Sequence, residues 1–265
     1  MSISIVTISF NQMKFLAEAI DSVLATSEST DLELILIDPG SSDGSREMIL
    51  EYAMHDSRVR YLFEKDLGPA DGLNKGFSLA TKDYIGFINS DDYYLPGTIE
   101  EVDNMFYLNR DCAVLLGHGF KLRNGKLEMI ISDNFNAKSY AFGRCNFLQQ
   151  STFYNRSILT SLNVQFNLCN HTCWDGEFLF DIALSGGKLK TVSKLWGVFR
   201  IHHDSISGSG KLNEIYKSDR KRITQRYLDL KDLIPNKFAN LVSKIFCALL
   251  RRTRKVCLYP KLVFK

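Results

Sequence analysis

The strongest constraint on this chain is a repeated alternation of short apolar runs, polar turns and helix-like segments. Four runs of β-branched and apolar residues read as strands: Ser4 to Ser9, Leu32 to Asp38, Val59 to Glu64 and Tyr84 to Ile88. Between them lie stretches with apolar residues at helical spacing, such as Asp71 to Leu79. Strands that alternate with helices in this way favour a parallel, doubly wound sheet with helices on both faces.

The pattern becomes irregular after about residue 110, which predicts three regions within an α/β fold. Residues 1–110 form a first lobe, residues 111–210 a second lobe of the same domain, and residues 211–265 a helical C-terminal segment. In the second lobe we expect a strand at Ala113 to Leu116, a hairpin at Asn124-Gly125 and a helix from Glu177 to Leu184. A chain of 265 residues is long enough to bury such a core without cross-links.

Composition excludes several classes of protein. Hydrophobic residues make up 45% and charged residues 24%, which is typical of a folded globular chain and not of a disordered one. A net charge of +3 is too small to indicate a nucleic-acid partner. The 6 cysteines lack the spacing of a disulfide framework, and we find no signal peptide or spanning apolar run, so we expect reduced thiols and a cytoplasmic location.

The turn Asn89-Ser90-Asp91-Asp92 directly follows the most apolar predicted strand. In open α/β sheets ligands bind outside the carboxyl ends of the strands, where this turn lies. Two adjacent carboxylates repel each other unless a cation or hydrogen-bond donors stabilise them, and Mg²⁺ or Mn²⁺ suits such oxygen ligands. Taken alone, the pair fits a solvated turn as well as a metal site.

The chain resembles the inverting family 2 glycosyltransferases, which have the nucleotide-sugar-binding fold called GT-A. Six blocks carry this resemblance over residues 3–210: VTISFNQ at 6–12, LILIDPGSSDGS at 34–45, EKDLGPADGLNKGFSLATKDYIGFINSDDYYLPG at 64–97, QQSTFYNRS at 149–157, WDGEFLFDIALSGGK at 174–188 and FRIHHDSIS at 199–207. The resemblance implies a central, mostly parallel sheet and a site for a nucleotide-diphosphate sugar.

The resemblance implies donor-binding roles in the first lobe. Residues expected to hold the base and ribose are Ser9, Phe10, Asn11 and Asp38; those expected near the diphosphate and sugar are Asp71, Asn74, Lys75 and Asp91. Their chemistry agrees, since an aromatic ring stacks on a base, a carboxylate accepts from hydroxyls and a helix N-terminus attracts phosphate. The alternatives are a core Phe10, a helix-capping Asp38 and a first-turn acid at Asp71.

The resemblance also implies a metal site and an acceptor site. Asn89 replaces the first carboxylate of the family's acidic motif, which leaves Asp92 as the expected metal ligand. His202, with His203 as the alternative, is expected to close on the metal or the diphosphate. Three residues are expected on the acceptor side: Gln149, Gln150 and Ser151.

An inverting transfer needs one carboxylate that takes the proton of the acceptor hydroxyl. Asp175 matches the family's position for this base, at the start of a helix, and Glu177 is the competitor. The alternative is that these two acids are a plain N-cap and a first-turn acid.

The resemblance therefore implies a metal-assisted transfer of sugar from a UDP-linked donor to a glycan or lipid-linked saccharide, with a β-linkage as product. One alternative is a sugar-phosphate nucleotidyltransferase, although the loop Ser9-Phe10-Asn11-Gln12 lacks the basic, Gly-rich character that a triphosphate requires. Another is a binding protein that has kept the fold without catalysis.

The C-terminal residues 237–265 carry eight Lys or Arg residues and no Asp or Glu, interleaved with apolar residues. A helix of this kind either lies at an anionic membrane surface or packs on the domain with a solvated basic face. The sequence leaves both interpretations open, so a peripheral membrane contact is one expected partner.

Overall fold

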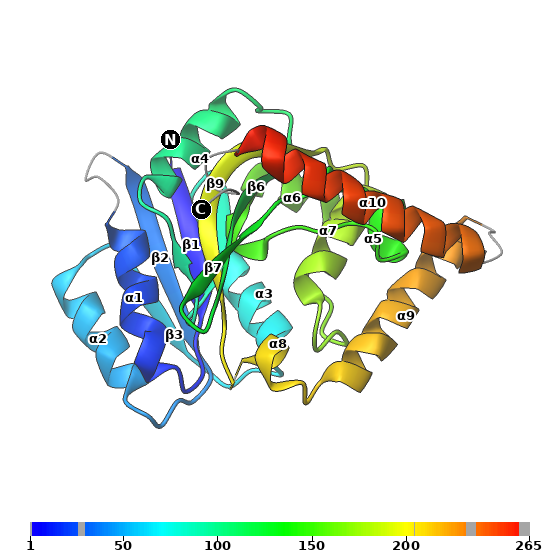
Figure 1. Cartoon of the computed structure of the whole chain (residues 1–265). Coiled ribbons are helices and arrows are strands. Elements are labelled where there is room, and N and C mark those ends of the chain that lie inside the picture. Colours follow the sequence, from blue (N-terminus) through cyan, green and yellow to red (C-terminus); the bar gives the residue numbers. More distant parts are fainter. Residues whose placement is uncertain (1, 26–29, 204, 232–236, 260–265) are drawn as a thin grey trace.

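The computed structural model describes residues 2–25, 30–203, 205–231 and 237–259. Figure 1 shows a twisted central sheet with helices on both of its faces. The sheet has nine strands in the order β3-β2-β1-β4-β8-β6-β9-β5, and β7 pairs with β6 outside this path. This is the α/β class that the sequence predicts.

The first four strands are parallel and lie close to their predicted positions. They are β1 (Ser2–Ile8), β2 (Asp31–Asp38), β3 (Val59–Phe63) and β4 (Tyr84–Asn89). The helices between them are α1 (Met13–Leu24), α2 (Ser45–His55) and α3 (Pro69–Leu79). The α3 helix starts two residues before the predicted Asp71, because a proline is well tolerated in the first turn of a helix.

The second part of the sheet is mixed. The strand β8 (Thr152–Asn155) runs antiparallel to β4 and to β6 (Val114–Arg123), while β9 (Leu189–Ile201) runs parallel to β6. Two short strands complete it, β5 (Tyr93–Tyr94) beside β9 and β7 (Lys126–Ile130) beside β6. The hairpin predicted at Asn124-Gly125 is present, with φ values of 50° and 72° that suit its tight turn.

Alternate residues of the central strands point into two separate cores. Ile5 faces the core under α1 and α4 (Thr98–Tyr107), whereas its neighbour Val6 faces the core under α3. Helix α3 approaches β1 so closely that a Cβ atom on Gly76 would lie 2.3 Å from Cγ1 of Val6. This close approach packs the second half of α3 directly against β1.

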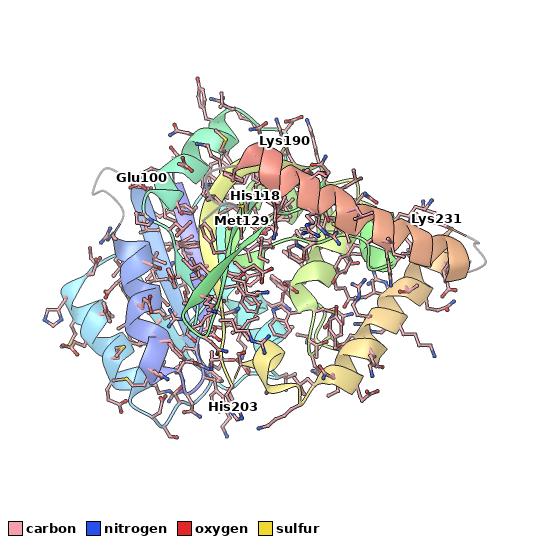
Figure 2. All side chains as sticks on the ribbon, viewed as in Figure 1. Glu100, His118, Met129, Lys190, His203 and Lys231 are labelled. Carbon is pink, nitrogen blue, oxygen red and sulfur yellow. The ribbon has the colours of Figure 1, made fainter. Side chains whose placement is uncertain are left out.

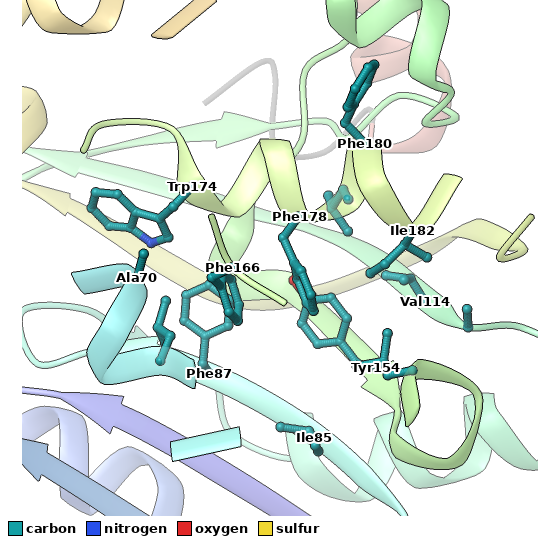
Figure 3. Packing of buried hydrophobic residues seen from close by; sticks show 14 of the residues in the cluster. Ala70, Ile85, Phe87, Val114, Tyr154, Phe166, Trp174, Phe178, Phe180 and Ile182 are labelled. Atoms are coloured by element: carbon teal, nitrogen blue, oxygen red, sulfur yellow. The ribbon is translucent and has the colours of Figure 1, made fainter. Parts of the chain in front are cut away.

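On the second face, aromatic residues join the sheet to α7 (Trp174–Leu184). The rings of Phe166 and Phe178 stack with centroids 4.0 Å apart, and Phe87 of β4 meets Phe166 edge-on (Figure 3). Three shorter elements surround this cluster: α5 (Ala137–Ala141), η1 (Gln149–Ser151) and α6 (Arg156–Leu162). Helix α7 begins three residues before the predicted Glu177, which places Asp175 in its first turn.

Three helices follow the sheet: α8 (Ile206–Ser209), α9 (Asn213–Leu230) and α10 (Lys237–Leu258). Helix α10 runs along the outer edge of the molecule (Figure 1), and Arg251 anchors it through an ion pair of 2.7 Å with Asp133. No helix within the described residues is long and apolar enough to cross a membrane. Lys261 and Lys265, which belong to the predicted basic segment, lie outside the described residues.

Candidate functional site

A pocket of about 830 Å³ opens where the parallel strands end. Its wall includes Ser9 and Phe10 after β1, Asp91 after β4 and Asp175 at the start of α7. Segments from four parts of the sequence meet here because the carboxyl ends of parallel strands share one edge of the sheet. Three of the expected donor-binding residues, Ser9, Phe10 and Asp91, therefore share one cavity with Asp175.

Asp38 ends β2 just behind Pro39, which lines the pocket. Its Oδ1 atom accepts hydrogen bonds from the amides of Gly40 and Ser41 and from Nε of Arg46, while its buried Oδ2 atom has no partner among the described residues. Asp38 itself does not line the pocket, but a buried carboxylate oxygen without a partner is costly, which makes Oδ2 a candidate acceptor for a ligand beside Pro39.

The loop after β1 carries a similar unsatisfied group. The buried hydroxyl of Ser9 has no hydrogen-bond partner in the part of the chain that the structure describes, and the ring of Phe10 is 58% exposed at the pocket wall. Asn11, with φ of 53°, accepts from the amide of Ser42 and donates its own amide to Ser41, which ties this loop to the loop after β2. Phe10 thus offers a ring face for stacking, and Asn11 holds the loop after β1 against the loop after β2.

The two carboxylates of the acidic turn have different environments. Asp92 is buried; its Oδ2 atom accepts from the amides of Asn89 and Gln150, and its Oδ1 atom accepts from the backbone amide of Arg200. Burial, followed by the negative charge of Asp91, raises the pKa of Asp92 well above its usual value. Asp91 lines the pocket instead.

His202 contacts the pocket-facing carboxylate. Its Nε2 atom lies 3.0 Å from Oδ2 of Asp91, and its ring packs on Phe15 with centroids 4.7 Å apart. His203 is exposed at the edge of the molecule (Figure 2). Of the two histidines, His202 is the one that meets the acidic turn.

The acceptor-side prediction covers three buried residues of η1. Gln149 and Gln150 line the pocket, and Gln149 donates to the backbone oxygen of Phe87. Ser151 does not line the pocket, because its hydroxyl donates to the backbone oxygen of His118 at 2.7 Å inside the protein. The side-chain amide of Gln150 donates to Asp92 and so holds the acidic turn in place.

The residues predicted on α3 are engaged within the protein. Both ends of the Asn74 amide bond the backbone of Phe166, at 2.9 Å each. Lys75 pairs with Glu64 at 2.8 Å, and Asp71 accepts from the amide of Leu67. None of these three α3 residues lines the pocket. Asn74 therefore holds the segment that carries Phe166, while Lys75 and Asp71 hold the loop between β3 and α3.

Asp175 is partly exposed in the pocket, and its only protein hydrogen bond to a described residue is from the amide of Gly176 to Oδ1, at 2.8 Å. Burial raises the pKa of Asp175 to about 6, and the backbone amides and Arg220 oppose this rise. At neutral pH the side chain is therefore ionised yet ready to take a proton. This is the electrostatic setting of a general base.

Glu177 lies two residues further on and has no exposed surface. Arg222 holds it through two hydrogen bonds of 2.6 and 2.7 Å, and Arg226, Asn167 and Asn170 donate to it as well. Burial alone would raise the pKa of Glu177, but the donors, Arg222 first, outweigh it and leave the pKa below its usual value. A carboxylate held in this way is a poor proton acceptor.

The pocket wall also includes residues that sequence reasoning missed, among them Asp66 and Trp174. Asp66 lies three residues after the end of β3, and burial raises the pKa of its carboxyl. Trp174 precedes the predicted base and lines the same cavity. The position of Asp66 after a strand, like those of Asp38 and Asp91, is the signal that could have found it.

The acidic turn offers the carboxylate of Asp91, which lines the pocket, as a ligand for a divalent metal. Within the described part of the chain no three His, Cys, Asp or Glu side chains converge on one point. Mg²⁺ and Mn²⁺ nevertheless commonly bind through one or two carboxylates, with substrate phosphates and water completing the shell. Asp91, the adjacent His202 and the unpartnered buried Oδ1 of Asn89 supply suitable atoms. Asp92, the ligand expected from the sequence, has both oxygens occupied by protein donors.

The fold and its strand-end pocket define a GT-A glycosyltransferase. The structure is similar to that of S. aureus TarS 1–349 in complex with UDP-GlcNAc, with a TM-score of 0.66 and 16% identity over 98% of this chain and 76% of that one. It is also similar to the mannosyltransferase PcManGT from Pyrobaculum calidifontis in complex with GDP-Man and Mn²⁺, with a TM-score of 0.60 and 13% identity over 97% of this chain and 83% of the other. Both comparisons confirm the predicted fold.

Residues 4–161 match the model of glycosyl transferase family 2, and the chain belongs to this family. It is an enzyme of the glycosyltransferase class. A relative in Campylobacter jejuni, the GalNAc(5)-diNAcBac-PP-undecaprenol beta-1,3-glucosyltransferase, is 23% identical over 242 residues, which are 88% of this chain and 74% of the relative. The matched family region ends before α7, so Asp175 lies beyond it.

Proposed function

We propose that this enzyme transfers a sugar with inversion from a UDP-linked donor to a hydroxyl group of a saccharide, with Asp175 as the general base. One observation carries the proposal: Asp175 shares a single cavity with the strand-end residues Ser9, Phe10 and Asp91. A base within the donor pocket can reach an acceptor oxygen that attacks the anomeric carbon. No other carboxylate of the first turn of α7 is open to the cavity, since Glu177 is buried.

The reaction is a single displacement. The acceptor oxygen forms a bond to the anomeric carbon, the bond from that carbon to the diphosphate breaks, and the acceptor proton passes to Asp175. An α-linked donor gives a β-linked product. Ser9, Phe10 and the free Oδ2 of Asp38 provide a hydroxyl, a ring face and an acceptor for the nucleoside.

A bound divalent cation, Mn²⁺ or Mg²⁺, would supply positive charge for the leaving diphosphate. Asp91 and His202 are the residues that we assign to hold it. This changes the expectation from the sequence, in which Asp92 is the ligand. The amides of Asn89 and Gln150 instead hold Asp92 as a buried support for the turn.

We propose a glycan or a lipid-linked saccharide as the acceptor and a peripheral position at the cytoplasmic membrane surface. The name of the Campylobacter jejuni relative, which includes a diphosphate-linked polyprenol, supports the lipid-linked class. Exposed apolar residues on α10, Ile245 and Leu249, support a membrane contact.

A panel of nucleotide sugars tests the donor assignment. With Mn²⁺ present, a UDP-sugar is expected to raise the melting temperature more than GDP- or CMP-sugars do, because a bound ligand stabilises the folded state. Release of UDP, with and without an added saccharide, then measures turnover. Formation of pyrophosphate from UTP and a sugar 1-phosphate would instead identify a nucleotidyltransferase.

Two neighbouring variants test the metal assignment. Asp91→Asn is expected to weaken metal-dependent binding of UDP by about 10- to 100-fold, as loss of a ligand-sphere contact commonly does. Asp92→Asn keeps the shape of the buried turn and is expected to lower the thermal stability more than the affinity for the metal. The reverse result, measured by titration calorimetry with Mn²⁺, would restore Asp92 as the ligand.

A further inference from the structure

A second cavity, of about 480 Å³, lies away from the strand ends, between α5, α9 and α10. Its wall carries four cations and no carboxylate: Lys217, Arg220 and Lys221 of α9 and Lys244 of α10. Glycosyl transfer in the strand-end pocket makes no use of it.

The cations differ in how they are satisfied. Lys217 pairs with Glu214 at 2.6 Å, and the guanidinium of Arg220 donates to the backbone oxygen of Tyr140 and stacks over its ring. Lys221 and Lys244 make no hydrogen bond or ion pair with any described residue. Like charges gathered in one concave site repel each other and attract an anion.

The backbone keeps this cavity open. Gly143, just past the end of α5, has φ of +66°, and a Cβ atom there would lie 3.3 Å from Nζ of Lys244. The last carbonyls of α5 do not compete for the lysines, because Thr224 donates to the oxygen of Ala141 at 2.7 Å and Arg220 to that of Tyr140. The two lysine ammonium groups are thus available for a ligand.

Two apolar side chains of α10 near this cavity are exposed. Ile245 is 56% exposed and Leu249 is 59% exposed, one helical turn apart, while Arg251 anchors the helix to the domain from another side. A cation cluster beside an exposed apolar stripe matches a bilayer surface, where phosphate groups adjoin the hydrocarbon region.

We propose that the cavity lined by Lys221 and Lys244 binds the phosphate of an anionic membrane lipid, while Ile245 and Leu249 enter the bilayer interface. Tyr140 connects this cavity to helix α7. Arg220 of the cavity wall stacks over the Tyr140 ring, and the tyrosine oxygen would lie 2.0 Å from a Cβ atom on Gly176. Bound lipid would therefore hold the Asp175 pocket close to the membrane.

Co-sedimentation with vesicles tests this proposal without donor or acceptor, so its outcome is independent of the proposed transferase chemistry. The protein is expected to bind vesicles of phosphatidylcholine and phosphatidylglycerol, to lose binding as salt increases, and to leave pure phosphatidylcholine vesicles nearly unbound. Absence of binding to the anionic vesicles would overturn the proposal.

The double variant Lys221→Ala/Lys244→Ala is expected to bind the anionic vesicles about 25-fold less, or about fivefold for each cation. A control variant, Arg123→Ala/Lys126→Ala, removes two exposed cations from the hairpin between β6 and β7 and is expected to bind as the wild type does. Equal losses in both variants would show that general surface charge, and not the cavity, drives binding. Melting temperatures confirm that both variants fold.

Two further measurements locate the ligand. Ile245→Ser/Leu249→Ser is expected to weaken vesicle binding by about tenfold or more, because it removes apolar surface from the interface. Unchanged binding would remove α10 from the contact. Calorimetry with inorganic phosphate or pyrophosphate, in the absence of vesicles, is expected to show little heat; tight binding that Lys221→Ala/Lys244→Ala abolishes would identify a soluble phosphate ligand and contradict the lipid assignment.

Discussion

Two acidic side chains in the first turn of α7, Asp175 and Glu177, lie in opposite environments. Asp175 faces the pocket with one hydrogen bond from the described protein and a pKa of about 6. Glu177 faces α9, has no exposed surface and is held by Arg222, Arg226 and two asparagines. The comparison shows how one helical turn holds one carboxylate that is open to the pocket and another that is satisfied within the protein. Satisfied hydrogen bonds stabilise the first turn, and the group left unsatisfied is available for chemistry.

The largest expected effect concerns the pocket side. Asp175→Asn is expected to reduce turnover by about 10³- to 10⁴-fold, because the amide cannot take the acceptor proton. The dissociation constant of UDP, measured by calorimetry, is expected to stay within about twofold of the wild type. Asp229→Asn, an exposed acid on α9, serves as the control. Retained turnover in Asp175→Asn would remove the functional contrast between the two carboxylates.

The next effect concerns the α9 side. Arg222→Ala leaves the buried Glu177 without its bidentate partner and is expected to lower the free energy of unfolding by about 2 kcal/mol, since Arg222 is itself partly exposed. Urea denaturation measures this loss. Lys221→Ala removes a neighbouring cation that has no described partner and is expected to change stability by less than about 0.5 kcal/mol. Equal losses would mean that the network does not hold the helix.

The pH dependence of kcat/KM sharpens the assignment of the base. Below a pH of about 6 the Asp175 carboxyl holds its proton and cannot accept another, so the rate is expected to fall about tenfold for each pH unit below the pKa. Above that pH the rate is expected to level off. The same profile measured for Arg222→Ala tests the other side of the turn. If Glu177 were the base, the pH at which the rate falls would shift in Arg222→Ala, because Arg222 lowers the pKa of Glu177.

The smallest effect is a gain in stability. The folded-state pKa of Asp175 lies above the ordinary value of 3.8, so the folded protein binds this proton more tightly and loses stability as the pH rises from about 4 to about 6. Asp175→Asn cannot ionise and is expected to be about 1 kcal/mol more stable than the wild type above that range, allowing for partial exposure of the site. The difference in melting temperature should vanish near pH 4. A gain that persists there would have another cause.

Local patterns in the sequence predicted the first four strands and their parallel order, because each strand, turn and helix is contiguous. The antiparallel pairing of β8 with β4 and β6 was not predictable in this way, since it joins residues that are far apart in the sequence. The family resemblance is confirmed by the match over residues 4–161. The roles given to individual side chains remain proposals.

The environments of individual site residues were likewise not predictable from local patterns in the sequence. The sequence places Asp91 and Asp92 side by side but does not show that Gln150 and Arg200 bury one of them. It favours Asp175 over Glu177 only through the family resemblance, because the arginines that separate the two acids lie on α9. Asn74, predicted in the donor site, bonds Phe166, a residue 92 positions away. Long-range hydrogen bonds decide which polar group remains free, and a local pattern contains no record of them.

The bonds between α9 and Glu177 have a consequence for protein engineering. The loop with Asn167 and Asn170, the first turn of α7 and the arginines of α9 form one unit, although the family region matched by comparison stops at residue 161. A chimera that exchanges acceptor preference between relatives should therefore transplant residues 167–230 as a single cassette. A junction placed between α7 and α9 would combine a carboxylate from one parent with arginines from another, and the crossover would be tolerated only where both parents share this ion-pair geometry.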